Sequence, residues 1–303
     1  MSITLTSAPG PSSGAVAPPR GGDRQQRAAG AALVNVGRAV SRVALIPSHS
    51  AATTGRGFQM LISVLRYTVA DALSFRLPAG EAVVQAWNLF KVTATPALLM
   101  AIPFGAMVTV VTSGLVNQVG ATSLLGAASG VGVIRQGAPI TAGLLMGGAA
   151  ASAIASDFGA RAIREELDAM RVLGVDPVRR LVMPRFWALV LIAPALCVFI
   201  TVSGTATAFL MAVSFTEVTP GSFWMSFGTF AKMVDVWFAI GKSVIFAAIV
   251  AIVSSLRGIE AKGGPRGVAD AVNSSVVLNV VCIVFTNLAI TQLQTMFFPM
   301  AVA

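Results

Sequence analysis

One stretch of the sequence could bind a phosphate group, Gly241-Lys242-Ser243. A phosphate-binding loop reads G-x-x-x-x-G-K-[ST], because its backbone wraps around the phosphates and its lysine pairs with them. The first glycine would have to occupy position 236, which is Val236, and the surrounding residues are apolar with no strand before them. We therefore expect no nucleotide site and no cofactor in this chain.

No other set of residues predicts catalysis or metal binding. His49, the only histidine, lies in a Ser/Thr-rich stretch without a companion ligand, whereas a metal such as zinc needs three or four. Without a histidine in the apolar part of the chain, no nucleophile–histidine pair can form there. Cys197 and Cys282 lie in apolar runs, where we expect free thiols that pack as small hydrophobic side chains. The chain is not expected to be an enzyme.

The most informative charged stretch covers residues 157–188, DFGARAIREELDAMRVLGVDPVRRLVMPRFWA. It predicts one amphipathic helix over about 158–173, which Gly174 and Pro177 would end. An apolar stripe and two pairs of opposite charge at i,i+4 spacing support this helix. The stripe is Ile163, Leu167, Met170 and Leu173, and the charge pairs are Arg161 with Glu165 and Arg164 with Asp168.

Such a helix can dock a soluble partner. Its apolar stripe would enter a groove while Glu165, Glu166 and Asp168 meet basic residues at the rim. The alternative is a helix in a loop that lies on the bilayer surface. The pattern by itself favours neither.

The runs that flank this stretch are long enough to cross a bilayer. Only 11% of the residues are charged, against about 25% in a soluble domain, and a bilayer core needs about 20 apolar residues per helix. Runs of this length fit helices better than the strands of an outer-membrane barrel, so the predicted fold class is an all-α membrane protein. Charged residues are absent from 92–134, 136–156, 186–216 and 271–303, and from 236–256 except for Lys242.

The basic residues predict an orientation. Of 21 Lys and Arg, nine precede the first long run, six lie between Arg161 and Arg185, and three between Arg257 and Arg266. If residues 92–134 cross once, these eighteen share one side, which the positive-inside rule makes cytoplasmic.

We therefore expect five spans, with the N-terminus cytoplasmic and the C-terminus outside. The first would run near 96–117, followed by a Gly/Ser-rich return and a second span from about Arg135. The net charge of +9 follows this topology and does not indicate nucleic-acid binding.

Three regions divide the chain. Residues 1–55 are rich in Gly, Pro, Ala and Ser and lack the apolar core of a signal peptide, which predicts a disordered cytoplasmic tail. Within 56–95, apolar residues at helical spacing predict an interfacial helix that contains Arg66 and Arg76. A helix packed on the rest of the protein fits equally well. The transmembrane domain would cover 96–303.

The charged stretch resembles the cytoplasmic signature of the MlaE/YrbE permeases, membrane subunits of ABC transporters that work with MCE-domain proteins. That signature has an acidic pair, a following Asp-Ala, Gly-x-Asp-Pro and a Pro-Arg before the next span. Here these are Glu165, Glu166, Asp168, Ala169, Gly174, Asp176, Pro177, Pro184 and Arg185. The resemblance covers about residues 56–300, and REELDAM looks closest to actinobacterial YrbE proteins. Gln136, often acidic in the family, and Ala149, an arginine in some members, depart from it.

The resemblance implies a non-catalytic permease of the cytoplasmic (inner) membrane with five transmembrane helices. A dimeric cytoplasmic ATPase, which holds ATP and Mg²⁺, would supply the energy. Other implied partners are a second permease copy or a YrbE paralogue, MCE-domain proteins outside, and a lipid such as a fatty acid or sterol, with import expected. The coupling helix would use Arg164, Glu165, Glu166, Asp168, Met170, Gly174, Asp176 and Pro177.

Two basic residues lie near the outer ends of spans. Arg135 would start the second span, and Lys242 would lie a few residues inside the fourth, where a charge costs about 2.5–3.5 kcal/mol. Either could contact an anionic lipid headgroup or the MCE partner, and Lys242 could instead snorkel to the interface. An ion-gradient-driven secondary transporter and a membrane scaffold that recruits a soluble protein are the rival functions.

Overall fold

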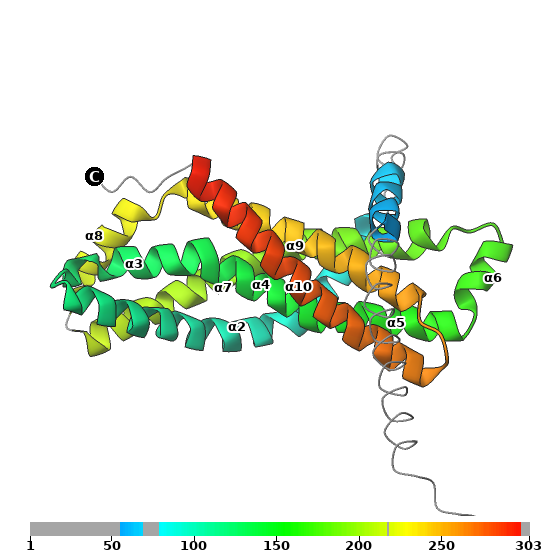
Figure 1. Cartoon of the computed structure of the whole chain (residues 1–303), viewed down its shortest axis with the longest axis horizontal. Helices are drawn as coiled ribbons and strands as arrows, with labels where there is room; N and C mark the ends of the chain where they lie inside the picture. Colours follow the sequence, from blue (N-terminus) through cyan, green and yellow to red (C-terminus); the bar gives the residue numbers. More distant parts are fainter. Residues whose placement is uncertain (1–54, 69–78, 217, 298–303) are drawn as a thin grey trace, which may run out of the picture. The chain divides into compact units, whose positions relative to one another are not determined.

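The computed structural model describes residues 55–68, 79–216 and 218–297, which are almost entirely helical and contain no strand (Figure 1). Four long helices are continuous: α2 (Ala79–Gln118), α7 (Met183–Phe215), α9 (Met233–Ile259) and α10 (Pro265–Phe297). A fifth long segment joins α3 (Leu125–Val131), η2 (Gly132–Gly137), α4 (Ala138–Leu145), η3 (Met146–Ala150) and α5 (Ala151–Ile163). The short elements are η1 (Thr122–Leu124), α6 (Glu166–Val172), η4 (Val178–Val182) and α8 (Pro220–Phe230).

Five helical segments are long and apolar enough to cross a membrane, which confirms the fold class and the expected number of spans. The first of these helices begins at Ala82, so the span expected near 96–117 lies within a longer helix. The charge that suggested a later start, Lys91, does not interrupt α2, because its ammonium lies on the surface over the ring of Trp87, 5.1 Å from the ring centroid. The spans are Ala82–Gln118, Thr122–Ile163, Val178–Phe215, Met233–Ile259 and Pro265–Phe297.

The Gly/Ser-rich segment that we expected to be a return is shorter than expected: the chain does turn at its start, but the segment is helical from Thr122 on. The chain turns at Gly120, where φ is +70°, and α3 follows within a few residues. A Cβ on Gly126 would lie 2.2 Å from the carbonyl oxygen of Phe223, and one on Gly130 would lie 2.4 Å from the ring of Phe227. These glycines let α3 approach α8 closely, so the composition that suggested a loop forms a packing face.

The second span is not a uniform α-helix. Its backbone hydrogen bonds widen to the π pattern in η2 and again in η3. Such segments are rare and are frequent at functional sites. In this span, η2 contains Arg135 and η3 contains two residues that line a cavity.

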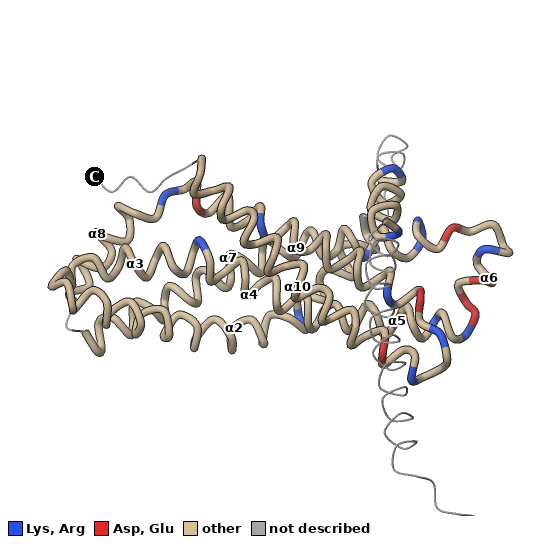
Figure 2. The backbone as a smooth tube through the Cα atoms, viewed as in Figure 1, with Lys and Arg blue, Asp and Glu red and all other residues tan. Residues whose placement is uncertain are grey.

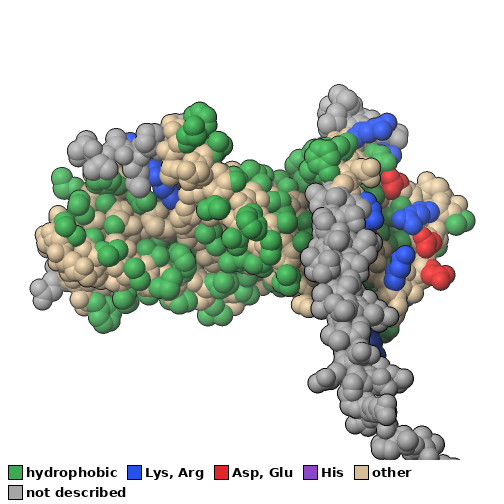
Figure 3. Space-filling model, viewed as in Figure 1, with side chains coloured by type: hydrophobic (Ala, Val, Ile, Leu, Met, Phe, Trp, Pro, Cys, Tyr) green, Lys and Arg blue, Asp and Glu red, His purple; other side chains and the backbone are tan. Residues whose placement is uncertain are grey.

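Helix α7 packs against α2, α4 and α9, and α5 packs against α9 and α10. Glycines allow the closest approaches. A Cβ on Gly105 of α2 would lie 2.3 Å from the carbonyl oxygen of Gly204 of α7, and one on Gly258 of α9 would lie 2.6 Å from the Cβ of Phe158. Hydrophobic side chains cover much of the flank seen in Figure 3, as expected for a surface in lipid.

The two ends of the helical bundle differ. Charged residues gather around α6, at what we call the α6 end, and are sparse along the long helices (Figure 2). At the opposite end, α2, α3 and α8 extend past the ends of α9 and α10 (Figure 1). Large apolar side chains are exposed there, among them Val119 (79%), Phe215 (75%) and Met225 (79%).

The helix over residues 55–68 packs on the α6 end, which agrees with one of the two alternatives for it. The Nε1 of Trp187 donates a hydrogen bond to the Thr68 hydroxyl at 3.0 Å, and Arg56 pairs with Glu260 at 2.8 Å. The helix is therefore part of the folded helical body.

The same helix also keeps an outward apolar face. Phe58, Ile62 and Leu65 are 63%, 49% and 46% exposed. This face would suit the interfacial role that we also considered, which stays a prediction. The predicted tail and the stretch at 69–78 lie outside the described residues.

Candidate functional site

The segment between α5 and α7 contains two helices rather than the single helix expected over about 158–173. Helix α5 ends at Ile163 and α6 begins at Glu166. Between them Glu165 has a φ of 59°, the only positive φ at a non-glycine residue in the described ranges. This left-handed conformation costs about 1–2 kcal/mol when a Cβ is present. Neighbouring contacts must therefore hold the break.

Ion pairs surround the break, but they are not the i,i+4 pairs expected. Those pairs assumed an unbroken helix and are wrong. The observed contacts are Arg161 Nη1–Glu166 Oε2 (3.6 Å), Arg164 Nε–Glu166 Oε1 (3.2 Å) and Arg171 Nη1–Asp168 Oδ1 (2.7 Å). Glu166 thus connects α6 to the last turn of α5. Because these side chains are partly exposed, each pair contributes about 0–1 kcal/mol.

The expected apolar stripe is split between two environments. Leu167 is buried and Met170 is partly buried. Val172 and Leu173 are 87% and 77% exposed, so the free apolar surface lies at the C-terminal turn of α6 rather than along its length. We call Val172 and Leu173 the α6 tip.

A compact turn ends α6, as the sequence predicted. Gly174 has a φ of +77°, and its N–H donates to the carbonyl of Arg171 at 3.0 Å. The N–H of Val175 donates to the carbonyl of Met170 at 2.9 Å. This is the Schellman arrangement, in which a glycine takes the left-handed conformation just past the helix.

Asp176 and Pro177 begin the next helical segment. The Asp176 Oδ1 accepts the N–H of Val178 at 2.9 Å, which is an N-cap, and Pro177 occupies the following position, where its missing N–H does no harm. The other carboxylate oxygen of Asp176 accepts the hydroxyl of Tyr67 at 2.6 Å. This hydrogen bond raises the pKa of Tyr67, and burial adds to the rise. Gly174, Asp176 and Pro177, which belong to the signature described above, therefore form the turn between α6 and the third span.

Away from α6, polar side chains from the second span, α9 and α10 meet inside the bundle. The Nε of Arg135 lies 2.7 Å from Asp235 Oδ1, and the Nε2 of Gln294 donates to the same oxygen at 3.0 Å. The Arg135 and Asp235 side chains are 12% and 3% exposed. We call the whole set the buried polar cluster: Arg135, Gln136, Asp235, Lys242, Asn287, Thr291 and Gln294.

Lys242 is an inward member of this cluster. It is 1% exposed, and its ammonium donates to the carbonyl of Arg135 at 3.1 Å and to the hydroxyl of Thr291 at 3.0 Å. The suggestion that Lys242 snorkels to the interface is therefore wrong. Gln136, which departs from the family pattern, accepts from Asn287 at 3.1 Å and donates to Thr291 at 3.3 Å.

The sequence analysis found Arg135 and Lys242 but missed their partners. A usable signal was present in α10, because Asn287, Thr291 and Gln294 follow the i, i+4, i+7 spacing of one helix face. Asp235 gave no comparable signal. It directly precedes the run 236–256, so it looks like a charged residue outside the span. The Gly-Lys-Ser sequence around Lys242 lies inside α9 and forms no loop.

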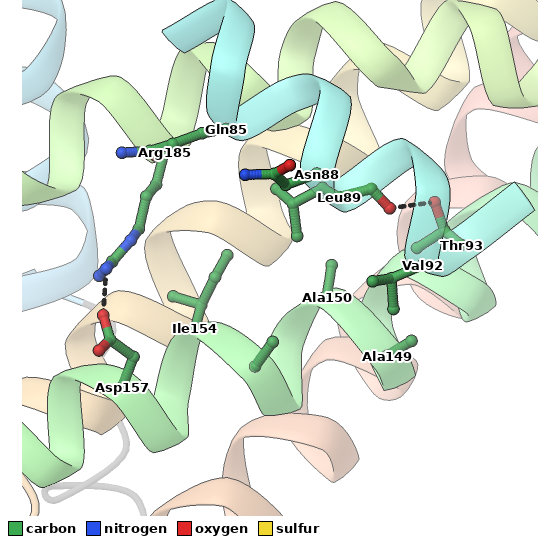
Figure 4. Close-up of a pocket in the computed structure, with 11 residues that line it drawn as sticks. Gln85, Asn88, Leu89, Val92, Thr93, Ala149, Ala150, Ile154, Asp157 and Arg185 are labelled. Atoms are coloured by element: carbon green, nitrogen blue, oxygen red, sulfur yellow. Dashed lines mark hydrogen bonds and ion pairs between the residues drawn. The ribbon is translucent and has the colours of Figure 1, made fainter. Parts of the chain in front are cut away.

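A cavity of about 350 Å³ lies between α2 and the second span, toward the α6 end (Figure 4). Leu89 and Val92 of α2 face Ala150 and Ile154 across it. Asp157 and Arg185 form an ion pair at one end of the cavity. The Arg185 guanidinium also lies 4.3 Å from the ring centroid of Phe158. Asp157 is shared with Arg161 (3.3 Å), so a chain of charges runs from Glu166 of α6 to this cavity.

The described residues include no group of three or more His, Cys, Asp or Glu side chains that could hold a metal ion. His49 lies outside them. Cys197 and Cys282 are free thiols, as expected.

Comparison with known proteins gives a consistent set of relatives. Residues 82–293 match the family described as permease MlaE. A probable ABC transporter permease of Synechocystis is 28% identical over 204 residues, which cover 63% of this chain and 78% of that protein. The intermembrane phospholipid transport system permease protein MlaE of Haemophilus influenzae is 29% identical over 52% of this chain and 60% of that protein. The chloroplastic protein TRIGALACTOSYLDIACYLGLYCEROL 1 of Arabidopsis thaliana is 26% identical over 58% of this chain and 50% of that protein.

Proposed function

Because the chain belongs to the MlaE permease family, we propose that it is the non-catalytic, membrane-spanning permease of an ABC-type transporter that moves lipids across the cell envelope. A separate cytoplasmic ATPase binds ATP and Mg²⁺ and supplies the energy. The name of the Haemophilus relative, which specifies phospholipid transport, supports a lipid substrate. Fatty acids and sterols are further candidates of the same apolar class, with import as the direction.

The observation that carries this proposal is the geometry of α6. The helix stands at the end of the bundle, away from the long helices (Figure 1). Its exposed tip, Val172 and Leu173, is flanked by Asp168 and Arg171, whose side chains are 70% and 58% exposed. An apolar patch with a charged rim suits a groove on a soluble protein, which here is the ATPase.

Motion of α6 has a direct route into the membrane. Glu166 holds α6 to α5 through ion pairs, and the turn at Gly174 and Asp176 leads at once into the third span. An ATPase whose two states hold α6 at different positions would therefore shift the second and third spans. A two-fold ATPase requires two permeases, either this chain twice or this chain with a paralogue.

The α6 end is cytoplasmic in this proposal, since the basic residues around it follow the positive-inside rule. The N-terminus is then cytoplasmic and the C-terminus extracytoplasmic. The exposed apolar residues at the opposite end, such as Val119 and Phe215, support contact there with lipid and with MCE-domain proteins.

An ion-gradient-driven carrier is the second candidate, because the buried polar cluster holds three ionisable side chains: Arg135, Asp235 and Lys242. Such carriers place ionisable groups inside the membrane. Arg135 and Asp235 pair with each other, however, and Lys242 donates to the carbonyl of Arg135 and the hydroxyl of Thr291, which favours a structural role. Contact of Arg135 or Lys242 with an anionic headgroup would require the cluster to rearrange.

Purification of the tagged full chain from its native host, followed by mass spectrometry, tests the proposal. Wild-type chain should retain an ATPase and MCE-domain proteins, whereas Val172→Asp/Leu173→Asp should lose the ATPase while still inserting into the membrane. Lys262→Asp, an exposed change in the turn between α9 and α10, is the control and should retain it. An ATPase that stays with the double variant would show that the α6 tip is not the docking surface.

The rival functions give different results in the same preparation. A carrier or a scaffold would purify without an ATPase, or with one whose turnover does not respond to lipid. Lipid-dependent turnover is expected only of the transporter.

A further inference from the structure

Proline and glycine residues occur in three neighbouring helices at one level of the bundle. A Cβ on Gly137 of the second span would lie 2.2 Å from the ring of Phe104, which directly follows Pro103 inside α2. One residue further along α2, Gly105 meets Gly204 of α7, and a Cβ on Gly204 would lie 3.3 Å from a side chain of the second span. Sharp bends in helices occur mostly at proline, at glycine and at π segments, so this is the level at which the bundle bends most easily.

The two sides of this level have separate hydrophobic cores. On one side, α3 packs on α8 around a small core of Leu125, Ala212, Val218 and Phe223. On the other side, α5 packs on α9 and α10 within the main core. We call α3, α8 and the ends of α2 and α7 that contact them the α8 lobe, which extends past the ends of α9 and α10 (Figure 1). The second span, α2 and α7 therefore connect two bodies.

Pro139 interrupts the second span where it passes from one body to the other. In an α-helix the N–H of residue 139 would donate to the carbonyl of Arg135, but proline has no N–H and its ring crowds that carbonyl. The wider turns of η2, in which the N–H of Ala138 donates to the carbonyl of Val133, lie directly before the proline. The ammonium of Lys242 on α9 donates to the Arg135 carbonyl at 3.1 Å. A side chain of another helix thus supplies a donor that the proline lacks.

Lys242 is held in this position by a further contact. Its ammonium also donates to the hydroxyl of Thr291 on α10 at 3.0 Å, and the residue is 1% exposed. Helices α9 and α10 therefore hold the turn before Pro139 from the side of the main core. If Lys242 moved away, the buried carbonyl of Arg135 would lose this donor, which is unfavourable.

We propose that this level is a hinge and that Lys242 is its latch. While the ammonium holds the carbonyl of Arg135, the second span keeps one direction and the α8 lobe is fixed on the bundle. When the ammonium leaves, the turn before Pro139 opens and the lobe tilts. The hinge is a property of the fold and requires neither an ATPase nor a lipid. Its test is therefore independent of the function proposed above.

Hydrogen exchange of the full chain in mild detergent, read by mass spectrometry, tests the latch. Lys242→Met should speed exchange of the amides in residues 133–143 about fivefold or more, because the turn loses a buried hydrogen bond and opens. Amides of residues 186–193, in α7, should exchange as in wild type. A rise of the same size in both regions would show that Lys242 only stabilises the fold, and unchanged exchange in 133–143 would remove the latch.

Pro139→Ala tests the cause of the effect. It returns an N–H to the turn, so the carbonyl of Arg135 can accept from its own helix, and the effect of Lys242→Met should fall to about twofold or less. Pro96→Ala, which removes a proline from inside α2, is the matched control and should leave the effect unchanged. An effect of Lys242→Met that is the same with and without the proline would contradict the latch.

Pro139→Ala also decides the matter alone if Lys242→Met does not fold. It should slow exchange of residues 133–143, because the turn gains a backbone hydrogen bond. Exchange as fast as in wild type would then overturn the proposal.

Spin labels measure the tilt itself. Ser123→Cys and Ser156→Cys place labels at exposed positions on either side of Pro139, in a chain whose two native cysteines are replaced by alanine. The distance between the labels should have one narrow distribution when Lys242 is present and a broader or shifted one in Lys242→Met. A distribution that stays narrow and unshifted in Lys242→Met would show that the α8 lobe does not tilt and would overturn the hinge.

Discussion

Tyr67 is the only tyrosine in the chain, and its hydrogen bond to Asp176 holds the N-terminal helix on the turn after α6. The bond stabilises the protonated phenol, so the pKa of Tyr67 lies above its ordinary value of 10.0. The native protein therefore binds this proton more tightly than the unfolded chain does. The stabilisation is complete below about pH 10 and is lost as the pH rises through the raised pKa.

Ultraviolet titration of tyrosinate reads this pKa directly, because no other tyrosine contributes. The midpoint should lie above 10.0 in the wild-type chain. Asp176→Asn keeps an acceptor oxygen but removes the charge, so its midpoint should shift down toward that ordinary value. A midpoint unchanged by Asp176→Asn would mean that the two side chains do not interact in solution.

Single residues near α6 show what sequence can and cannot predict. Gly174 and Pro177 were predicted to end the helix, because their backbone restrictions are local properties. The break at Glu165 was not predicted, since a glutamate carries no signal for a left-handed conformation. The sequence also could not show whether the Lys242 side chain points into the bundle or toward the membrane surface, because its hydrogen-bond partners lie on two other segments of the chain.

At the scale of helices, glycines determine which pairs can approach closely. Gly105 meets the backbone of Gly204, whereas Gly114 on the same helix has open space where a Cβ would be. Gly105→Ala should therefore destabilise the fold by about 1–3 kcal/mol through overpacking of α2 on α7. Gly114→Ala, the matched control, should be neutral. Thermal unfolding of both variants in the same detergent measures the difference, and equal stabilities would contradict this packing.

Hydropathy predicted the number of spans, because length and apolar composition suffice for that. It failed in the segment from Ser123 to Gly132, which has the composition of a loop. Small residues have two roles in a membrane protein: they allow turns, and they allow helices to pack closely. The contacts of Gly126 and Gly130 with Phe223 and Phe227 on α8 show that here the small residues serve helix packing.

At the scale of the whole molecule, the buried polar cluster ties three segments together. Asp235→Asn would leave Arg135 buried without its carboxylate, at a cost of about 3–5 kcal/mol. Arg135→Gln/Asp235→Asn removes both charges and should cost much less, whereas Asp270→Asn, in an exposed position on α10, should have little effect. Unfolding measurements on all three variants complete the test. Additive losses in the double variant would show that the two charges are not coupled.

The cluster also explains the limit of prediction at this scale. Arg135 and Lys242 stand out singly as charges near the ends of spans, but the grouping exists only after the second span, α9 and α10 are arranged side by side. Sequence periodicity gives the face of each helix but not the neighbour of that face.

The place of α10 in the chain has a consequence for how the protein is made. Asn287, Thr291 and Gln294 are costly in hydrocarbon on an isolated helix, and α10 follows the second span and α9 in the chain. Their partners, including Gln136 and Asp235, belong to segments that leave the ribosome earlier. When α10 enters the bilayer, the earlier segments can already present the hydrogen-bonding groups that its polar side chains need. Order of synthesis and order of assembly therefore coincide for these three segments.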